Sequence, residues 1–309
     1  MPRRVSRRTF LAGSAAAGLA AAAPWAFAEE RPMPMRAFGR TGETVSLAGL
    51  GTAQWRARSM PEEQAAAIVA RALDLGVTYI DTAPSYGSTH AETCLGAALK
   101  GVRDKVFLAT KTLARDGDGA RRELEGSLRR LRTDRVDLLQ FHALGSDADT
   151  DRIRAGGGAL EAGAEAVKAG KVRYLGITGH RDPHVFVAAL KRHPFDTLLI
   201  PLSCIDPHHL SFEEHALPVA KEKKTGVIAM KVFCSGKLPA QRIVRAEDCL
   251  RYTYGLDVAT CIVGCTEVEQ IELAAHVARN LKRMDADERA VTLAKTRDFS
   301  PDLEWYKRK

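Results

Sequence analysis

Residues 77–92 read VTYIDTAPSYGSTHAE and combine a β-rich run with two ionisable side chains. Residues 77–80 predict a strand, Asp81 follows it directly, and Pro84 keeps the loop that contains Tyr86 from continuing as a strand or a helix. A tyrosine with the ordinary pKa of about 10 is a poor proton donor at neutral pH unless a nearby cation stabilises its anion. The segment therefore predicts that a lysine lies beside Asp81 and Tyr86.

Two later apolar runs also end on an ionisable residue. Residues 106–111 read VFLATK and end on Lys111, and residues 136–142 read VDLLQFH and end on His142. An ionisable group at the end of a buried strand costs free energy unless it faces a polar cavity. In a barrel of parallel strands, the carboxyl ends of all the strands meet at one face. Asp81, Lys111 and His142 are therefore predicted to share one cavity at that face.

The alternation of apolar runs with helical patterns repeats along the chain. Strands are predicted at residues 45–52, 77–80, 106–111, 136–142, 172–178, 195–202, 226–232 and 260–264, among eight helical patterns. A turn-rich segment at residues 38–44 predicts a short N-terminal hairpin. Eight such units, in a length close to the roughly 250 residues of one barrel, predict a (β/α)8 TIM barrel with a hairpin cap. A doubly wound sheet is the alternative, and the lack of a G-x-G-x-x-G motif after the first strand disfavours it.

The first 28 residues have the pattern of a secretory signal. Residues 6–11 read SRRTFL, with paired arginines before an Ala-rich apolar stretch that ends in AFA at residues 26–28. We therefore predict a twin-arginine signal peptide at residues 1–28, a barrel domain at residues 29–309, and export to the periplasm by the twin-arginine machinery. No later segment approaches the roughly 18 apolar residues of a membrane span, so none is expected in the mature chain. An uncleaved N-terminal anchor is the alternative.

The charge and the cysteines argue against several classes of protein. Removing the four arginines of the signal lowers the formal net charge from +8 to 8 − 4 = +4, which is too little to favour nucleic acid as a partner. The six cysteines form no C-x-x-C pair, so neither a zinc site nor an iron–sulfur cluster is indicated, and buried free thiols are expected. His180, His184, His208 and His209 match no known ligand spacing, so no metal site is predicted.

The strand-end residues resemble the catalytic tetrad of the aldo/keto reductase family. Asp81 and Tyr86 in DTAPSYG, Lys111 in ATK and His142 in LQFH occur in the family's order and at matching strand ends. Further similarity lies at GLGT, KVRYLGIT and IVGCTEVEQ, which are residues 49–52, 171–178 and 262–270. The resemblance implies an oxidoreductase that transfers hydride reversibly between NADP(H) and a small aldehyde, ketone or alcohol. NAD(H) is the alternative cofactor.

The resemblance also implies a role for each of the four residues. Tyr86 would give a proton to the developing alkoxide, Lys111 would lower the pKa of Tyr86, and Asp81 would hold the lysine in place. His142 would orient the carbonyl oxygen, and it could also share the proton donation. The protonation state of His142 stays open at this point.

The cofactor residues follow from the same resemblance. The candidates are Gly51, Thr52, Thr178, Met230, Lys231, Gly264, Thr266 and Gln270. At the nicotinamide end the chain departs from the family's pattern. Thr178-Gly179 stands where the family has Ser-Asn to hold the carboxamide, Leu199 stands near the position of a glutamine, and Met230 replaces a stacking tyrosine.

Departures also occur at the adenine and phosphate end. Leu273-Ala274 aligns with the Glu-Asn pair that holds adenine in the family. Gln270 aligns with the arginine that reads the 2′-phosphate, which leaves Lys231 and Lys237 as substitutes. Backbone N–H groups at the start of the last helix could still bind phosphate.

The substrate pocket has few signals in the sequence. Trp55, His180 and the tail WYKR at residues 305–308 are candidates for its wall, although the tryptophan and the tail could equally be packing or a flexible end. Because the cofactor positions are altered, a ligand-binding or accessory barrel with a degenerate cofactor site is the alternative function. A barrel isomerase that works without nicotinamide is a third.

Overall fold

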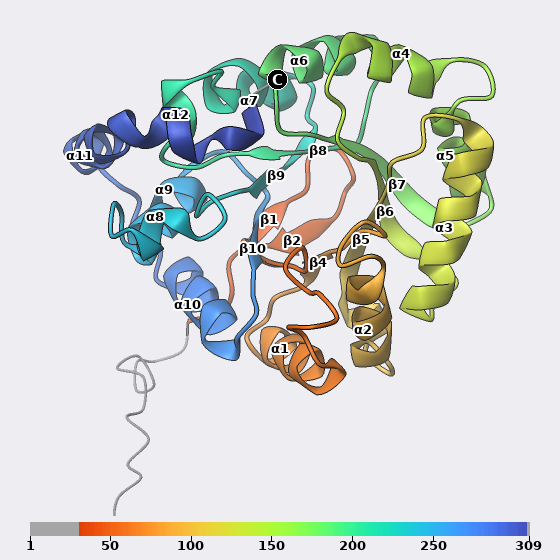
Figure 1. Cartoon of the computed structure of the whole chain (residues 1–309), viewed down its shortest axis with the longest axis horizontal. Coiled ribbons are helices and arrows are strands. Elements are labelled where there is room, and N and C mark those ends of the chain that lie inside the picture. Colours follow the sequence, from red (N-terminus) through yellow and green to blue (C-terminus); the bar gives the residue numbers. More distant parts are fainter. Residues whose placement is uncertain (1–30, 308–309) are drawn as a thin grey trace, which may run out of the picture. The chain divides into compact units, whose positions relative to one another are not determined.

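The computed structural model describes residues 31–307, and the predicted signal peptide at residues 1–28 lies outside them. Eight parallel strands close into a barrel in the order β10-β3-β4-β5-β6-β7-β8-β9, with helices arranged around it (Figure 1). The strands are β3 (Ala48–Gly51), β4 (Tyr79–Asp81), β5 (Phe107–Thr112), β6 (Val136–Phe141), β7 (Val172–Thr178), β8 (Thr197–Pro201), β9 (Gly226–Met230) and β10 (Thr260–Gly264). The predicted (β/α)8 barrel is confirmed, and β7 and β10 have the predicted bounds.

At least one helix follows each barrel strand. One helix for each strand completes the eight βα units: α1 (Glu62–Asp74), α2 (His90–Ala98), α3 (Gly117–Leu131), α5 (Ala159–Lys168), α6 (Pro183–Arg192), α7 (Phe212–Glu222), α9 (Ala246–Gly255) and α10 (Val268–Arg279). The additional ones are α4 (Asp147–Arg154), α8 (Lys237–Ala240), α11 (Ala286–Thr296) and α12 (Ser300–Leu303). In α3, Ala120, Leu124 and Leu128 recur every four residues and form one buried stripe. Within residues 31–307, no helix is long and apolar enough to cross a membrane.

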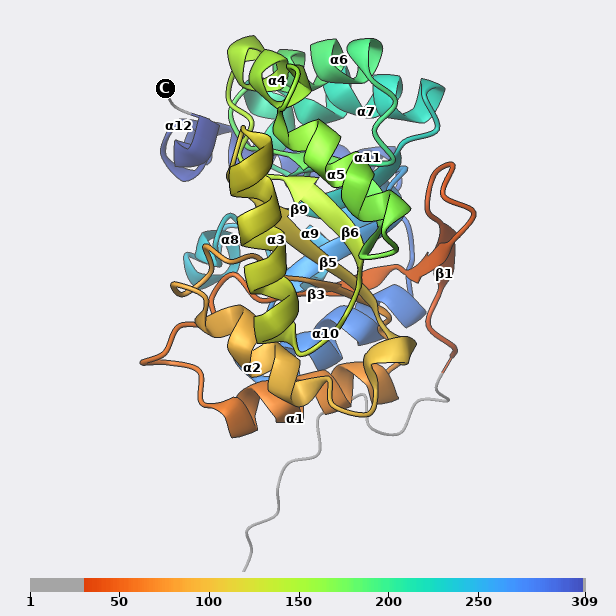
Figure 2. The same ribbon diagram turned by 90° about the vertical axis from the view of Figure 1, so that its right-hand side faces the viewer.

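A short antiparallel hairpin closes the N-terminal end of the barrel, as predicted. It consists of β1 (Met35–Ala37) and β2 (Thr44–Ser46). Between them, the buried ring of Phe38 packs edge-on against Tyr79 and Phe107, with centroid separations of 5.8 and 5.3 Å. Gly226 makes room for this ring, because a Cβ there would lie 2.5 Å from it. Figure 2 shows the hairpin at one side of the molecule and α8 and α12 at the other.

The alternation of side chains along each strand separates an apolar barrel interior from a polar mouth. Tyr79, Phe107, Leu138 and Met230 belong to the buried cluster inside the barrel. Because every second residue of a strand faces the same side, Asp81 points inward above Tyr79, and Gln140 points inward above Leu138. Polar side chains are therefore gathered at the C-terminal ends of the strands.

Six of the eight barrel strands end one or two residues away from the predicted ends, and two of these differences affect residues of the site. Asp81 still belongs to β4, because it pairs in register with Gly51 and with Ala109. On β9, the strand ends at Met230 rather than at residue 232, because Lys231 adopts a left-handed backbone with φ of 62°. The side chain of Lys231 consequently leaves the regular alternation of the strand.

All six cysteines are buried and unpaired, as expected. They are Cys94, Cys204, Cys234, Cys249, Cys261 and Cys265. Burial raises the pKa of Cys265 to about 12, and burial raises the pKa of Cys234 to the same level. These two thiols therefore stay protonated at neutral pH. The described residues 31–307 contain no group of three or more His, Cys, Asp or Glu side chains placed to hold a metal ion.

Candidate active site

Asp81 and Lys111 form a buried ion pair at the barrel mouth. Asp81 ends β4 and Lys111 lies in β5, and both side chains are essentially inaccessible to solvent. The Lys111 ammonium donates to Oδ1 of Asp81 and, at 2.8 Å, to the main-chain carbonyl of Thr82. Gln140 Nε2 donates to the other Asp81 oxygen at 2.9 Å. Both carboxylate oxygens are therefore satisfied, which a buried charge requires.

Tyr86 and His142 complete the predicted group of four. Lys111 Nζ lies 4.6 Å from the centroid of the half-buried Tyr86 ring. The Tyr86 and His142 rings meet edge-to-face, with their centroids 6.0 Å apart. The structure thus brings together four side chains from three strand ends and a loop.

The electrostatics of Tyr86 and Lys111 are set by opposing effects. Burial raises the pKa of Tyr86, and the positive charge of Lys111 opposes this increase only in part. Burial by itself would lower the pKa of Lys111, but Asp81 and Tyr86 raise it above its usual value. Lys111 is therefore a stable cation. Its charge does not bring the pKa of Tyr86 below that of a free tyrosine.

The two histidines at the mouth are neutral at physiological pH. Burial is the main cause that lowers the pKa of His142 to about 2, and the charges of Lys111 and Arg115 lower it further. Burial also lowers the pKa of His180 to about 3, with contributions from Lys231 and Lys111. His142 therefore acts as a neutral imidazole that can donate one hydrogen bond. Its Nδ1 has no hydrogen-bond partner among the described residues.

Because of these pKa values, the protein is expected to lose stability on acidification. In the unfolded chain a histidine gains a proton below about pH 6.5, whereas folded His142 and His180 stay neutral down to about 2 and 3. The unfolded state therefore binds more protons, and the free energy of unfolding falls by up to about 1.4 kcal/mol per pH unit per histidine as the pH drops below 6.5. Urea unfolding at pH 7 and pH 5 measures this loss.

Two histidine-to-glutamine variants show whether His180 contributes to this pH dependence of the unfolding free energy. His180→Gln should flatten the decrease in unfolding free energy between pH 7 and pH 5. His184→Gln should not, because His184 is exposed on α6. The same pH dependence in both variants would show that His180 titrates normally in the fold.

Two residues that contribute to the site were not predicted. Gln140 holds Asp81 and lies two residues before His142 on the same side of β6, so the alternation of the strand could have indicated it. Arg115 donates to the main-chain carbonyls of His142 and Ala143 at 2.9 and 3.2 Å. Nothing in the sequence around Arg115 pointed to this contact.

Four candidate cofactor residues lie at the mouth or on neighbouring strands. The buried Thr178 hydroxyl, at the end of β7, has no hydrogen-bond partner within residues 31–307. Met230 belongs to the inward-facing cluster at the end of β9. Gly51 pairs in register with Gly264, so two residues without side chains end the neighbouring strands β3 and β10.

Other candidates are occupied by contacts within the chain. Thr52 donates through its main-chain N–H and its hydroxyl to the carbonyl of Asp81, at 3.0 and 3.1 Å. The Gln270 amide oxygen accepts from the main-chain N–H groups of Thr266 and Glu267, at 2.6 and 3.2 Å. Glu267 and Gln270 also form a capping box on α10. An anion at this helix start would compete with the side chain of Gln270.

The departures from the family's pattern are built into the packing. A Cβ on Gly179 would lie 2.4 Å from the Leu144 carbonyl oxygen and 2.5 Å from the Phe186 ring, so no amide side chain fits there. Leu199 lies in the apolar cluster inside the barrel, and Ala274 is one of the buried residues of α10. These positions contribute packing in place of polar contacts.

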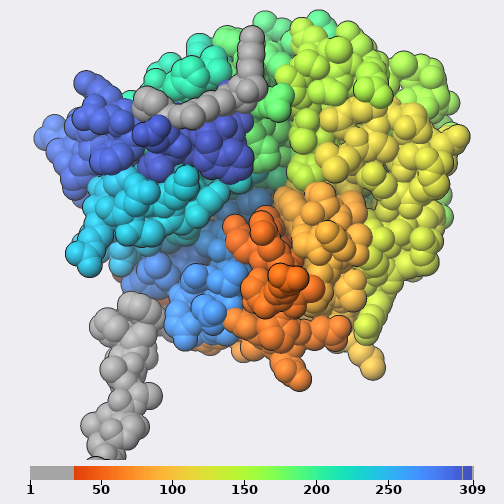
Figure 3. Space-filling model, in the orientation of Figure 1, coloured from red at the N-terminus to blue at the C-terminus, as the bar shows by residue number. Residues whose placement is uncertain are grey.

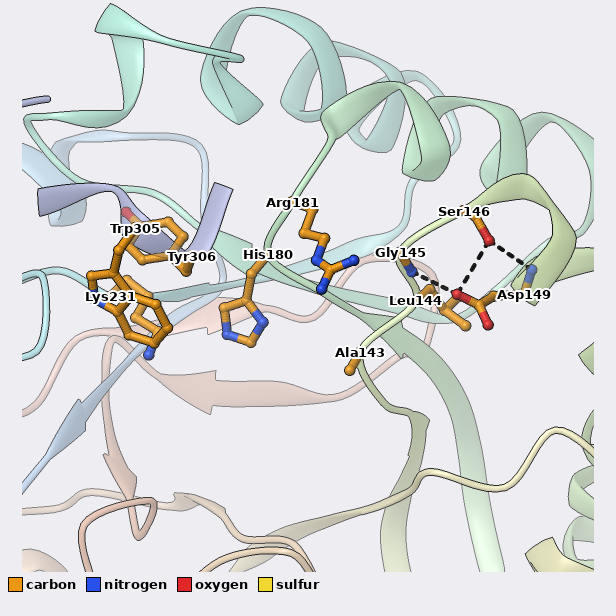
Figure 4. A pocket seen from close by; sticks show the side chains of 10 residues that line it. All are labelled: Ala143, Leu144, Gly145, Ser146, Asp149, His180, Arg181, Lys231, Trp305 and Tyr306. Carbon is orange, nitrogen blue, oxygen red and sulfur yellow. Dashed lines mark hydrogen bonds between the residues drawn. The ribbon is translucent and has the colours of Figure 1, made fainter. Parts of the chain in front are cut away.

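A cavity of about 570 Å³ is lined in part by Ala143, which directly follows His142 in the chain (Figure 4). Its walls are residues 143–146, Asp149, His180, Arg181, Lys231, Trp305 and Tyr306. His180 lies there. Trp55 does not, because it is fully buried and its indole N–H donates to the Cys265 carbonyl at 2.7 Å. The structure thus gives Trp55 a packing role.

Residues 305–307 are anchored to the rest of the chain through Lys307. Lys307 is fully buried and forms ion pairs with Asp206 at 2.7 Å and with Glu304 at 2.6 Å. It also donates to the His209 carbonyl at 2.6 Å. Figure 3 shows α11 and α12 in dark blue on the surface, between the regions of α7 and α8. This anchor holds Trp305 and Tyr306 against the cavity.

Comparisons with known proteins identify the family of the chain. The model of the aldo/keto reductase family matches residues 48–249. Aldo-keto reductase YhdN of Bacillus subtilis is 33% identical over 219 residues, which cover 64% of this chain and 61% of that protein. The match thus spans about three fifths of that relative's length.

Solved structures show the same similarity. Aldo-keto reductase AKR11C1 from Bacillus halodurans, in its holo form, has a TM-score of 0.72 and 26% identity, over 85% of this chain and 96% of that one. An aldo-keto reductase from Klebsiella pneumoniae in complex with NADPH, at 22% identity, shares the fold with a TM-score of 0.67, over 87% and 96% of the two chains. The chain therefore belongs to the aldo/keto reductase family.

Proposed function

We propose that the protein is an oxidoreductase that transfers hydride reversibly between NADP(H) and the carbonyl carbon of a small aldehyde or ketone. The observation that carries this proposal is the buried Lys111 cation, which is paired with Asp81 and lies 4.6 Å from the Tyr86 ring. A cation in that position stabilises the phenolate that forms when Tyr86 gives up its proton. Membership of the aldo/keto reductase family supports the same reaction class.

Each of the four residues has a role that its surroundings allow. When bound, the nicotinamide supplies or accepts the hydride. Tyr86 donates its proton to the carbonyl oxygen as negative charge develops there, and Lys111 stabilises the resulting phenolate. Asp81 and Gln140 fix the lysine from behind. Neutral His142 donates a hydrogen bond to the same oxygen and orients the carbonyl.

The residues present fit the nicotinamide end of the cofactor. The unpartnered hydroxyl of Thr178 offers a hydrogen bond to a carboxamide, and the Met230 thioether offers a contact to the ring. The NADPH complex of the Klebsiella reductase, which shares the fold, supports NADP(H) as the cofactor. At the phosphate end, Gly264 and Thr266 remain the candidates, whereas Lys231 lines the cavity beside Trp305 and Tyr306.

An accessory or ligand-binding barrel is the second candidate function. It is favoured by the packing around Gly179 and by the contacts of Gln270, which leave two cofactor positions of the family without a free polar side chain. An isomerase that works without nicotinamide has no specific observation in its favour. Cofactor binding separates the first two candidates.

We expect NADPH to quench the tryptophan fluorescence of the purified protein, because Trp305 is half-exposed at the cavity. The measurement is a titration with NADPH and, in parallel, with NADH, after a check for nucleotide that has co-purified. Oxidation of NADPH by an aldehyde, followed through the near-ultraviolet absorbance of reduced nicotinamide, then tests turnover. A folded protein that binds neither nucleotide would move the assignment to the accessory barrel.

We further propose that the protein is exported to the periplasm by the twin-arginine pathway. The support is the SRRTFL segment at residues 6–11. This route moves folded cargo, so the cofactor would be bound before export. Replacing Arg7 and Arg8 by lysine should retain the protein in the cytoplasm, and unchanged export of that variant would contradict the proposal.

A further inference from the structure

The cavity of Figure 4 contains two cations without a carboxylate partner in the described part of the chain. Lys231 is half-buried, and its ammonium lies 5.6 and 5.8 Å from the ring centroids of Trp305 and Tyr306. Arg181 is exposed at the rim, and its side chain passes Gly145. Neither Lys231 nor Arg181 has an ion pair within residues 31–307. An anion from outside the chain could therefore pair with Lys231.

The acidic groups near the cavity are already neutralised. Asp149, which lines it, pairs with Arg115 at 3.2 Å and accepts from the Gly145 N–H at 2.9 Å. Asp81 pairs with Lys111. The cavity and the tetrad together therefore carry an excess of positive charge.

The histidines do not remove this excess. His180 lies between Lys231 and Arg181 in the view of Figure 4, and it is neutral, as is His142. Burial also lowers the pKa of Lys231, because it destabilises the charged form of the side chain. A bound anion would stabilise that form and raise the pKa again. A neutral imidazole next to the cations leaves the positive potential of the cavity in place.

The backbone supports a functional position for Lys231. Its φ of 62° is unusual for a residue other than glycine, and Ala143, which also lines the cavity, has φ of 56°. Such conformations persist where the surrounding structure holds them, and they gather at ligand sites. Here the conformation at the end of β9 directs the lysine to the cavity wall.

We propose that the substrate of this reductase is an oxo acid, whose carboxylate binds Lys231 while its carbonyl group lies at Tyr86 and His142. The proposal rests on the proposed carbonyl reduction. Arg181 at the rim adds positive potential that attracts the anion. Trp305 and Tyr306 contact the body of the molecule, which favours a flat or aromatic one. A volume of about 570 Å³ is in the range of small-molecule pockets.

A pair of aldehydes that differ only in charge tests the proposal. We would measure kcat/KM with NADPH for para-formylbenzoate and for para-formylbenzamide. The native protein should prefer the acid by about ten-fold or more, which is the effect of one charge-assisted hydrogen bond. Lys231→Met should remove this preference by lowering kcat/KM for the acid alone. Lys191→Met, a lysine exposed on α6, should retain the preference.

A binding measurement makes the test independent of turnover. Quenching of tryptophan fluorescence by benzoate and by benzamide should show tighter binding of the anion, and Lys231→Met should abolish the difference. If the protein reduces neither aldehyde but still prefers benzoate, the reductase proposal fails and the anion site stands. Equal affinity for benzoate and benzamide would overturn the anion site. Weaker NADPH binding in Lys231→Met, with both aldehydes affected alike, would assign the lysine to the cofactor and also overturn it.

Discussion

Tyr86→Phe is expected to lower kcat for carbonyl reduction by about 10²–10⁴-fold, which is the usual contribution of a positioned general acid. The variant removes only the hydroxyl, and the ring keeps its contacts with Lys111 and His142. NADPH binding should be unchanged, because the phenol acts on the substrate. Steady-state kinetics with a reactive aldehyde and the fluorescence titration measure the two effects separately.

The matched control is Tyr174→Phe. The Tyr174 hydroxyl donates to the Thr41 carbonyl at 2.9 Å, next to the N-terminal hairpin and away from the barrel mouth. This variant should keep the native kcat. If Tyr86→Phe reduced a good aldehyde as fast as the native protein does, the proton would come from another group, and the proposed mechanism would be wrong.

Lys111→Met is expected to abolish activity and to lower the free energy of unfolding by about 3–5 kcal/mol. The reason is that Asp81 would remain buried, with only the hydrogen bond from Gln140 to satisfy its charge. The phenolate of Tyr86 would also lose its cation. Urea unfolding followed by circular dichroism gives the stability, and the NADPH assay gives the activity.

A double variant shows whether the unpaired charge causes the loss of stability. Adding Asp81→Asn to Lys111→Met removes both charges and keeps an acceptor for Gln140, so most of the stability should return while activity does not. A Lys111→Met protein that unfolds at the native urea concentration would contradict the buried ion pair.

The sequence was sufficient for the barrel and for the place of the tetrad. Apolar runs are a strong signal for buried parallel strands, so the bounds of β7 and β10 agreed with the structure. The period of two residues along a strand then places Asp81, Lys111 and His142 at one mouth. No knowledge of side-chain contacts was needed for either step.

Other features of the site depend on tertiary contacts that the sequence pattern does not contain. Trp55 was a candidate pocket wall, but its partner Cys265 is 210 residues away in the chain, and no local pattern contains that contact. The cap that Gln270 makes on α10 competes with phosphate binding by the same N–H groups. Whether His142 is charged depends on its burial and on cations from other strands.

The six buried cysteines make this barrel suited to measurements by thiol labelling. A reagent can modify a protonated, enclosed thiol only when the structure around it opens, so each labelling rate reports the free energy of a local opening. Cys94 in α2 would report on the first half of the barrel, and the other five, at positions 204–265, on the second half. A single cysteine introduced at exposed Val291 could carry a fluorophore without replacement of the native six.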